Sequence, residues 1–254
     1  MQYSCNGCTA FSFYMLELNK IYLLDCIEGI RQLDDKSIDC VVTSPPYNKH
    51  NQTGENTNMK YDKYSDDISE EEYQAGQIEL LNELHRVLKD DGHIFYNHKN
   101  RYELGNLISP LYWLSKTDYN IREEIIWNRQ LTANTRGWRF WTVDERIYWL
   151  QKKSLKQQEI KNTVASMTNI WTISPKNNKE SGHPCAYPEE IVRRCLLALD
   201  GENLTILDPY MGSGTTAKVA KELGHNYIGF DISENYVKLA NEALENCNVE
   251  DFLI

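Results

Sequence analysis

The chain has 254 residues, a formal net charge of −10 and seven cysteines without regular spacing. This length suits one α/β domain and argues against two full domains, and no apolar run approaches the roughly 18 residues of a membrane span, so we expect a cytoplasmic protein with no membrane partner. The odd cysteine count argues against a disulfide framework, and the single Cys-x-x-Cys pair, Cys5 and Cys8, has no second pair to complete a zinc site, so no metal is expected.

The first two strands are expected at Ile21–Asp25 and Ile38–Thr43. Apolar and β-branched residues dominate the second run, which is typical of a buried strand in a parallel sheet. Strand-like and helix-like segments alternate along the rest of the chain. We therefore predict an α/β fold with a doubly wound, mostly parallel sheet.

The motif Ser44-Pro45-Pro46-Tyr47 directly follows the second strand. The prolines fix φ and restrict the residues before them, so the motif forms a stiff loop at the carboxyl end of the strand. Such a loop suits an exocyclic aromatic amine, which is a poor nucleophile until acceptors draw its hydrogens out of plane. The Ser44 hydroxyl and the Pro45 carbonyl are the candidate acceptors, and Tyr47 would stack on a base taken out of a duplex. The alternative is a Pro-Pro turn with a packing tyrosine.

The next segment, 48–67, is polar and follows the catalytic loop, so it is either a lid that orders on DNA or a surface loop. Ser69 is an N-cap, and Glu72 completes a capping box for a helix to about Lys89. Further strands are expected at 93–96, 124–127 and 146–150, with a helix from about 102 to 115.

Charge is distributed unevenly, which bears on a nucleic-acid partner. The net negative charge opposes such a partner, because phosphate contacts rely on Lys and Arg. However, residues 65–91 carry nine acidic and two basic side chains, whereas residues 129–161 carry eight basic and three acidic ones. The first region is interpreted as a solvated helix face, and the second is locally basic.

A target-recognition region is predicted at about 129–165, where guanidinium, amide and large aromatic groups mix. Arg and Asn pair with guanine and adenine edges. The alternative is that Trp138, Phe140 and Trp141 are core aromatics with arginines stacked on them. The predicted DNA-binding residues, including three that follow the catalytic loop, are Asn48, Lys49, His50, Arg129, Asn134, Arg136, Trp138 and Arg139.

The last third of the chain is predicted to bind a ligand. Pro188 opens a helix to Leu199, and the buried strand 204–207 leads into a Gly-rich turn and a helix from Thr215 to Leu223. The turn allows close backbone approach to a ligand. It lacks the Gly-Lys-Ser/Thr of a phosphate-binding loop and the full dinucleotide spacing.

Asp231 ends the next strand, 226–232, which precedes a helix from about 234 to 246. It lies at about the separation from the Gly-rich turn at which an acidic residue accepts hydrogen bonds from ribose hydroxyls. The ligand thus looks like a nucleoside without an essential phosphate. A purely structural aspartate is the alternative.

With these motifs in hand, the chain resembles the S-adenosylmethionine-dependent DNA amino-methyltransferases of the β arrangement, in which the catalytic motif precedes the cofactor motif. Asp208–Thr216 is similar to the family's Asp-Pro-Phe-x-Gly-Ser-Gly-Thr-Thr loop, with Tyr210 in place of Phe. Leu23–Cys26 resembles the segment whose acidic residue contacts adenine. His183-Pro184, ahead of the Pro188 helix, is similar to the motif that packs over the methionine end of the cofactor.

The resemblance implies a Rossmann-like methyltransferase domain over residues 1–254, with a catalytic half at 15–128, an inserted recognition region at about 129–165 and a cofactor half at about 180–246. The expected cofactor is S-adenosylmethionine. The catalytic set is Ser44, Pro45, Pro46 and Tyr47, and the cofactor set is Asp25, Cys26, His183, Asp208, Pro209, Tyr210, Gly212, Ser213, Gly214, Thr215, Thr216, Asp231 and Ile232.

The resemblance also implies duplex DNA as the partner, a possible companion restriction endonuclease, and a monomer or homodimer. Ser before Pro-Pro-Tyr is commoner in cytosine-N4 members and Asp in adenine-N6 members, so N4 of cytosine is favoured over N6 of adenine. Protein glutamine methyltransferases share the loop, but they place the cofactor motif first and carry Asn before the prolines. An RNA or protein methyltransferase and a non-catalytic DNA-binding platform stay open as alternatives.

Overall fold

The computed structural model describes residues 16–48, 63, 68–130, 137–153, 160, 167–175 and 187–247. The strands are β1 Lys20–Leu23, β2 Ile38–Thr43, β3 Leu88–His98, β4 Arg101–Glu103, β5 Asn106–Ile108, β6 Tyr119–Asn128, β7 Asp144–Lys152, β8 Ile170–Thr172, β9 Thr205–Asp208 and β10 Asn226–Asp231. The helices are α1 Cys26–Ile30, α2 Glu70–Val87, α3 Leu111–Leu114, α4 Glu189–Leu197, α5 Thr215–Glu222 and α6 Glu234–Glu245. No helix in the described ranges is long and apolar enough to cross a membrane.

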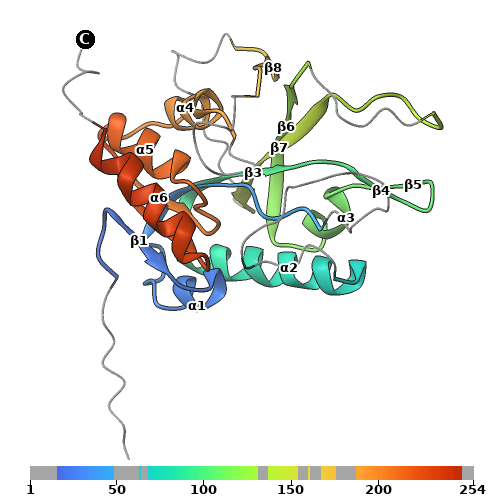
Figure 1. Cartoon of the computed structure of the whole chain (residues 1–254). Helices are drawn as coiled ribbons and strands as arrows, with labels where there is room; N and C mark the ends of the chain where they lie inside the picture. Colours follow the sequence, from blue (N-terminus) through green and yellow to red (C-terminus); the bar gives the residue numbers. More distant parts are fainter. Residues whose placement is uncertain are drawn as a thin grey trace, which may run out of the picture.

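Within the described residues, eight strands form one sheet in the order β1-β10-β9-β2-β3-β7-β6-β8. The first five are parallel to one another, β7 is antiparallel to both β3 and β6, and β8 is parallel to β6. Figure 1 shows α4, α5 and α6 on one side of the sheet and α1, α2 and α3 on the other. The predicted doubly wound, mostly parallel α/β fold is therefore confirmed.

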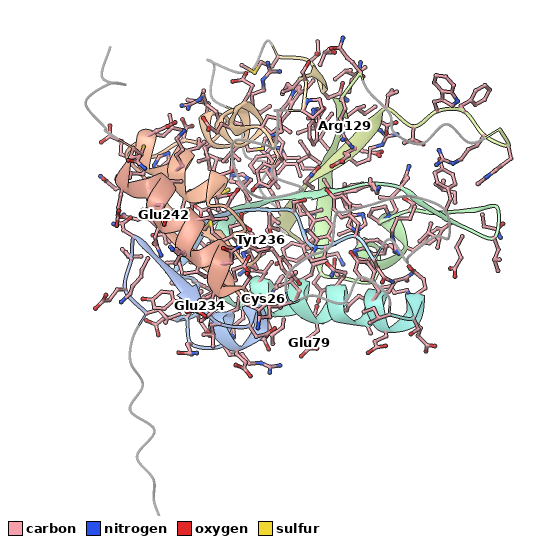
Figure 2. The ribbon with its side chains drawn as sticks, in the orientation of Figure 1. Cys26, Glu79, Arg129, Glu234, Tyr236 and Glu242 are labelled. Carbon is pink, nitrogen blue, oxygen red and sulfur yellow. The ribbon has the colours of Figure 1, made fainter. Side chains whose placement is uncertain are left out.

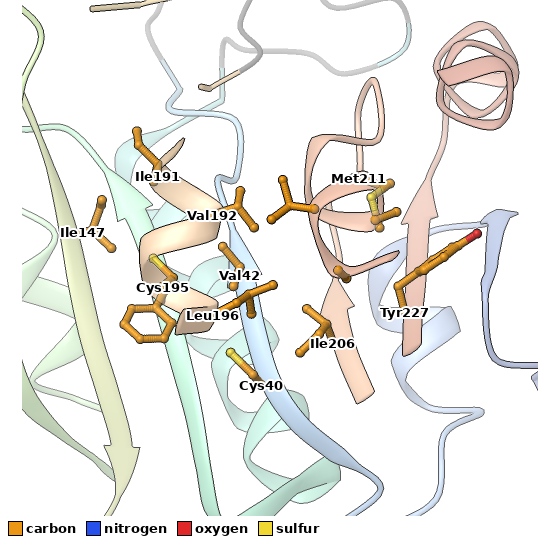
Figure 3. Packing of buried hydrophobic residues seen from close by; sticks show 14 of the residues in the cluster. Cys40, Val42, Ile147, Ile191, Val192, Cys195, Leu196, Ile206, Met211 and Tyr227 are labelled. Atoms are coloured by element: carbon orange, nitrogen blue, oxygen red, sulfur yellow. The ribbon is translucent and has the colours of Figure 1, made fainter. Parts of the chain in front are cut away.

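Each face of the sheet supports its own hydrophobic core, because successive residues of a buried strand point to opposite faces. In β2, Cys40 and Val42 contribute to one core, whereas Val41 contributes to the other. Figure 3 shows the first core, in which the apolar stripe of α4, with Val192 and Leu196, packs over β2 and β9. The second core contains α2 and α3.

The predicted helix at about 102–115 is wrong. Residues 101–108 form a β4–β5 hairpin, and α3 covers only Leu111–Leu114. Leu104 and Gly105 both have positive φ, at 48° and 82°, as a two-residue primed turn between paired strands requires. Pro110, at the N-cap position, fixes the start of the short helix. Sequence periodicity alone did not reveal this hairpin.

The other predicted elements are present, with ends that differ by a few residues. β2 has the predicted bounds, and β3, β6 and β7 extend beyond the predicted cores of these strands. β1 ends at Leu23 rather than Asp25, because Asp25 is the N-cap of α1, a short helix that the pattern did not predict. Helix α2 ends at Val87, because Leu88 is extended and begins β3.

The N-cap of α2 offers a test of the local structure. Ser69 Oγ accepts a hydrogen bond from the Glu72 backbone N–H at 3.2 Å. Ser69→Ala should lower the free energy of unfolding by about 1 kcal/mol, because it leaves that donor without its cap. Urea unfolding at pH 7 measures this loss, and Ser69→Asp, which keeps a capping oxygen, should retain the wild-type value. Equal stability of all three proteins would contradict a capping role.

Candidate active site

The two sequence motifs meet at one edge of the sheet. β2 and β9 are parallel neighbours, with Cys40 opposite Ile206 and Val41 opposite Leu207. The chain continues from β9 to β10 on one side and from β2 to β3 on the other, so the two strands flank a topological switch point. Ligands of open α/β sheets bind outside the carboxyl ends of the strands at such a point. The catalytic loop and the Gly-rich loop both begin there.

A side-chain hydrogen bond joins the ends of β2 and β9, where the two loops begin. Thr43, the last residue of β2, donates from Oγ1 to Asp208 Oδ1 at 2.8 Å. Thr216 Oγ1 donates to the other carboxylate oxygen at 2.7 Å, and the Tyr210 backbone N–H donates to Oδ1 at 3.0 Å. Asp208 therefore ties the catalytic strand, the cofactor loop and the first turn of α5 together.

Burial dominates the electrostatics of Asp208. Desolvation raises the pKa of this carboxyl to about 6, although the Thr216 and Thr43 hydroxyls oppose the shift by donating to it. The Tyr187 hydroxyl donates to Asp208 Oδ2 at 3.2 Å and also contacts Thr216 Oγ1. Burial, and then the nearby Asp208, raises the pKa of Tyr187 well above its ordinary value. Asp208 and Thr216, both almost fully buried, support the loop from beneath.

The Gly-rich turn wraps around Asp231. Gly212 and Gly214 have φ of 54° and 87°, in the left-handed region that favours glycine. A Cβ on Gly214 would lie 2.9 Å from that of Ala240 in α6. The Gly212 backbone N–H donates to Asp231 Oδ2 at 2.9 Å, and that of Ser233 donates to Oδ1 at 2.8 Å. Loop, carboxylate and the start of α6 thus form one unit.

The remaining predicted cofactor residues lie near this unit or support it. Asp25 is exposed, and its Oδ1 accepts from the Ile27 and Glu28 backbone N–H groups at 2.9 and 3.3 Å. Leu23 is paired with Asp231, which places Asp25 at the same sheet edge. Cys26 is buried, and desolvation raises the pKa of its thiol to about 12. Residues Pro209, Ser213 and Ile232 belong to the same loops, Thr215 begins α5, and His183 lies outside the described residues.

The catalytic loop is largely buried. The Tyr73 hydroxyl of α2 donates to the Pro46 carbonyl at 2.7 Å, which fixes the loop against the helix. Pro45 and Pro46 are buried, whereas Ser44 is partly exposed. A loop is therefore present at the end of a buried strand, as predicted, and its stiffness stays a prediction.

Tyr47 is more tightly held than a free stacking platform would be. Its ring packs against His98, with a 4.6 Å centroid separation. Its hydroxyl donates to Glu145 Oε2 at 2.9 Å, lies 2.9 Å from Ser44 Oγ, and accepts from Asn97 Nδ2 at 2.9 Å. The packing-tyrosine alternative thus describes part of what is seen, and stacking on a base stays a prediction.

Asn97 and Glu145 contact Tyr47 at the candidate site, and the sequence reasoning missed both. Asn97 lies near the end of β3, and Glu145 near the start of β7, which pairs with β3 in antiparallel register. Each is a polar residue beside a run of apolar ones, which was the only signal in the sequence. Their proximity depends on a strand pairing between segments about fifty residues apart.

Two predicted DNA-binding residues are committed to other contacts. Asn48 is buried, with its Nδ2 donating to the Ile68 carbonyl at 2.9 Å and its Oδ1 accepting from the Ile68 N–H at 3.1 Å. This disagrees with a role for the Asn48 amide in DNA binding. Arg129, labelled in Figure 2, donates from Nη1 to Glu145 Oε1 at 2.8 Å. Lys49, His50, Asn134 and Arg136 lie outside the described residues.

Three aromatic residues near the start of the predicted recognition region are on the surface. Trp138, Phe140 and Trp141 are 55%, 97% and 62% exposed, so the core-aromatic alternative is wrong for them. The Arg139 guanidinium lies 4.3 Å from the centre of the Tyr102 ring, which connects this segment to the β4–β5 hairpin. Residues 144–152 of the predicted region form β7, a strand inside the sheet.

The Gly-rich loop and the proline-containing loop begin at one switch point. This arrangement suits an enzyme in which the first loop binds the donor of a chemical group and the second binds its acceptor. The fold and the site therefore define an α/β enzyme of the group-transferring class. A family model named N6_N4_Mtase, described as DNA methylase, matches residues 38–242. The chain belongs to this DNA methylase family.

Individual relatives agree with the family match. The Streptococcus pneumoniae type II methyltransferase M2.DpnII is 30% identical, over 89% of this chain and 90% of its own length. Among solved structures, the PvuII cytosine-N4-specific DNA methyltransferase has a TM-score of 0.71 at 20% identity, covering 91% of this chain and 89% of the other. The Thermus thermophilus protein TTHA0409, complexed with S-adenosyl-L-methionine, has a TM-score of 0.64 at 19% identity, covering 89% of this chain and 92% of the other. At these identities the structural likeness shows the Rossmann-like fold alone.

Proposed function

We propose that this protein is a site-specific DNA methyltransferase that moves a methyl group to the exocyclic amino nitrogen of a base taken out of the duplex. The single observation that carries the proposal is the Thr43–Asp208 hydrogen bond, because it joins the strand end that leads into the amine-holding loop to the start of the loop that would hold the donor. Family membership supports DNA as the substrate. Base extraction is the general solution for enzymes that act on base atoms.

S-adenosylmethionine is the proposed donor, and the residues present fit it. The left-handed Gly212 and Gly214 leave the backbone of the loop without side chains, so a nucleoside could approach closely. Asp231 would accept from ribose hydroxyls, and Asp25, exposed at the same sheet edge, would contact adenine. When bound, the sulfonium group supplies an electrophilic methyl carbon.

The catalytic loop would hold the acceptor. The Ser44 hydroxyl and the Pro45 carbonyl accept hydrogens from the amine and localise its lone pair, and burial of the loop excludes water from these contacts. Tyr47 would stack on the base with its ring. Because the prolines and Tyr73 fix the loop before the base arrives, little reorganisation accompanies transfer.

We favour N4 of cytosine over N6 of adenine, because Ser44 precedes the two prolines. Methylating duplex DNA with the purified protein, digesting it to nucleosides and identifying the modified one by mass spectrometry tests both the function and the base. N4-methylcytosine is the expected product. Transfer of tritiated methyl groups to RNA or protein, with none to duplex DNA, would overturn the proposal.

The proposed DNA surface combines the β4–β5 hairpin with residues 137–142. Tyr102 and Trp138 meet edge to face at a centroid separation of 5.8 Å, and the Arg139 side chain lies against both rings. Exposed aromatic and guanidinium groups suit stacking on bases and contact with phosphates. A companion endonuclease, a monomeric or dimeric state and a cytoplasmic location stay predictions.

Replacement of Asp231 tests the cofactor assignment. Asp231→Ala should weaken S-adenosylmethionine binding by at least about tenfold, because a hydrogen bond to a charged group contributes about 1.5–3 kcal/mol. Isothermal titration calorimetry measures the change. Glu242→Gln, a charge removal on the outer side of α6, serves as the matched control and should bind normally. Wild-type affinity in Asp231→Ala would remove this residue from the cofactor site.

A further inference from the structure

We propose that Glu145, acting through the Tyr47 hydroxyl, orients Ser44 so that Ser44 Oγ accepts a hydrogen bond from the substrate amine, and that Glu145 receives the proton which the amine loses. This inference rests on the proposed function and names a carboxylate that the catalytic motif itself lacks. Ser44 stands where adenine-N6 members often carry Asp. Glu145, on β7, brings a carboxylate to the same loop from a distant part of the chain.

The hydroxyl and carboxylate oxygens form a continuous chain. Ser44 Oγ lies 2.9 Å from the Tyr47 hydroxyl, which lies 2.9 Å from Glu145 Oε2. Asn97 Nδ2 approaches all three groups, at 3.3, 2.9 and 3.2 Å in that order. Tyr47 and Glu145 are each only 7% exposed and Asn97 5%, so water has little access to the chain.

The chemistry of the groups fixes the direction of each hydrogen bond. A carboxylate and an amide N–H₂ have single roles, the first as acceptor and the second as donor. Tyr47 has one hydroxyl hydrogen, which Glu145 must accept. The Tyr47 oxygen then accepts the hydrogen of Ser44. The remaining lone-pair capacity of Ser44 is left for a hydrogen of the substrate amine.

Arg129 completes the arrangement on the other side of Glu145. Its Nη1 donates to Oε1, so the two oxygens of the carboxylate have separate partners, Arg129 for one and Tyr47 for the other. Fixing both oxygens holds the carboxylate in line with the Tyr47 hydroxyl. Arg129 is therefore assigned a positioning role at this site.

The proton transfer balances along the same chain. As the amine nitrogen bonds to the methyl carbon and the carbon–sulfur bond breaks, one N–H bond of the nitrogen breaks too. That proton passes to Ser44, the Ser44 proton passes to Tyr47, and the Tyr47 proton passes to Glu145. Ser44 and Tyr47 end unchanged and Glu145 ends as a neutral acid, which returns its proton to solvent after product release.

A double-mutant cycle tests the chain, using DNA methylation by the full-length protein as the readout. Glu145→Gln and Tyr47→Phe should each lower kcat by about 100-fold, a typical effect of losing an acid–base group. The double variant should be no slower than the slower single variant, because both changes break one chain. KM for S-adenosylmethionine and its calorimetric affinity should stay within about twofold of wild type.

Two controls separate this role from a merely structural one. Tyr47→Phe keeps the Glu145–Arg129 ion pair, so it tests the chain even where Glu145→Gln folds poorly. Glu124→Gln removes a carboxylate that pairs with Arg146 in the same sheet, 2.8 Å away, but is not part of the hydrogen-bonded series from Ser44 to Glu145. This variant should keep the wild-type kcat. Circular dichroism melting of each variant reports folding independently of activity.

The outcomes distinguish this inference from the proposed function. Wild-type protein without DNA methylation overturns both. Active wild-type protein with near-normal kcat in Tyr47→Phe or in well-folded Glu145→Gln overturns the hydroxyl chain alone. If the kcat losses of the two single variants multiply in the double variant, the hydroxyl chain is also overturned, because multiplied losses are what two independently acting residues would show.

Discussion

Tyr47→Ala is expected to reduce the turnover of DNA methylation by at least about 1,000-fold while leaving S-adenosylmethionine affinity unchanged. The substitution removes both the aromatic ring, whose stacking on a base is worth about 1–3 kcal/mol, and the hydroxyl that connects Ser44 with Glu145. It also leaves Asn97 and Glu145 buried beside a cavity. The cofactor loop is held by the Gly212–Asp231 and Thr43–Asp208 hydrogen bonds, which the substitution leaves in place, so donor binding should persist.

Single-turnover methylation of an oligonucleotide duplex, combined with calorimetry of the cofactor, measures both quantities. Tyr47→Phe is the matched variant, since it retains the ring and should lose less activity than Tyr47→Ala. The difference between the two variants separates stacking from the hydroxyl. Tyr22→Ala, which removes a tyrosine of β1 far along the sheet from the catalytic loop, controls for loss of an aromatic side chain. Undiminished methylation by Tyr47→Ala would exclude the assignment of the catalytic loop.

The sequence predicted the site best where chemistry follows directly from local pattern. The β-branched run before Ser44 predicts the end of one strand, and the Gly-rich turn before a helix predicts the end of another. Parallel strands place their carboxyl ends at the same edge of the sheet. Asp231 was predicted for the same reason, one strand later. These inferences need only the short-range rules for strands, prolines and glycines.

Contacts that depend on non-local strand pairing were beyond such reasoning. Glu145 reaches Tyr47 only because β7 inserts antiparallel between β3 and β6, and no local pattern specifies that order. The same insertion explains why Arg129 faces Glu145 as an ion-pair partner. Asn48 looked like an exposed loop amide, yet its positive φ of 50° turns the chain so that its amide meets Ile68.

The β4–β5 hairpin was missed for a different reason. Its residues carry a helix-like spacing of apolar side chains, and only the left-handed Leu104-Gly105 pair reveals the turn. This error concerns function as well as fold. Tyr102, placed by the hairpin beside Trp138 and Arg139, joins two segments that the sequence reasoning treated separately, so the proposed DNA surface is broader than the region 129–165.

Asp208 should make the stability of the fold fall as pH rises from about 4 to 7. Burial raises its pKa from 3.8 to about 6 in the folded protein, so the folded state binds this proton more tightly than the unfolded state does. The stabilisation from the protonated form is complete below pH 3.8 and is lost as pH passes through 6. The size of the shift corresponds to about 3 kcal/mol.

Comparison of wild type with Asp208→Asn isolates this effect from other titrating groups. The variant keeps the shape of the side chain but cannot titrate, so the stability of wild type relative to the variant should fall by about 2 kcal/mol between pH 4 and pH 7. Urea unfolding at steps of half a pH unit measures it, and Asp200→Asn, at an exposed aspartate after α4, should follow the wild-type curve. Parallel curves for wild type and Asp208→Asn would mean that the Asp208 carboxyl has an ordinary pKa in the folded protein. In that case the hydroxyl groups of Thr43, Thr216 and Tyr187 would compensate fully for the burial of its charge.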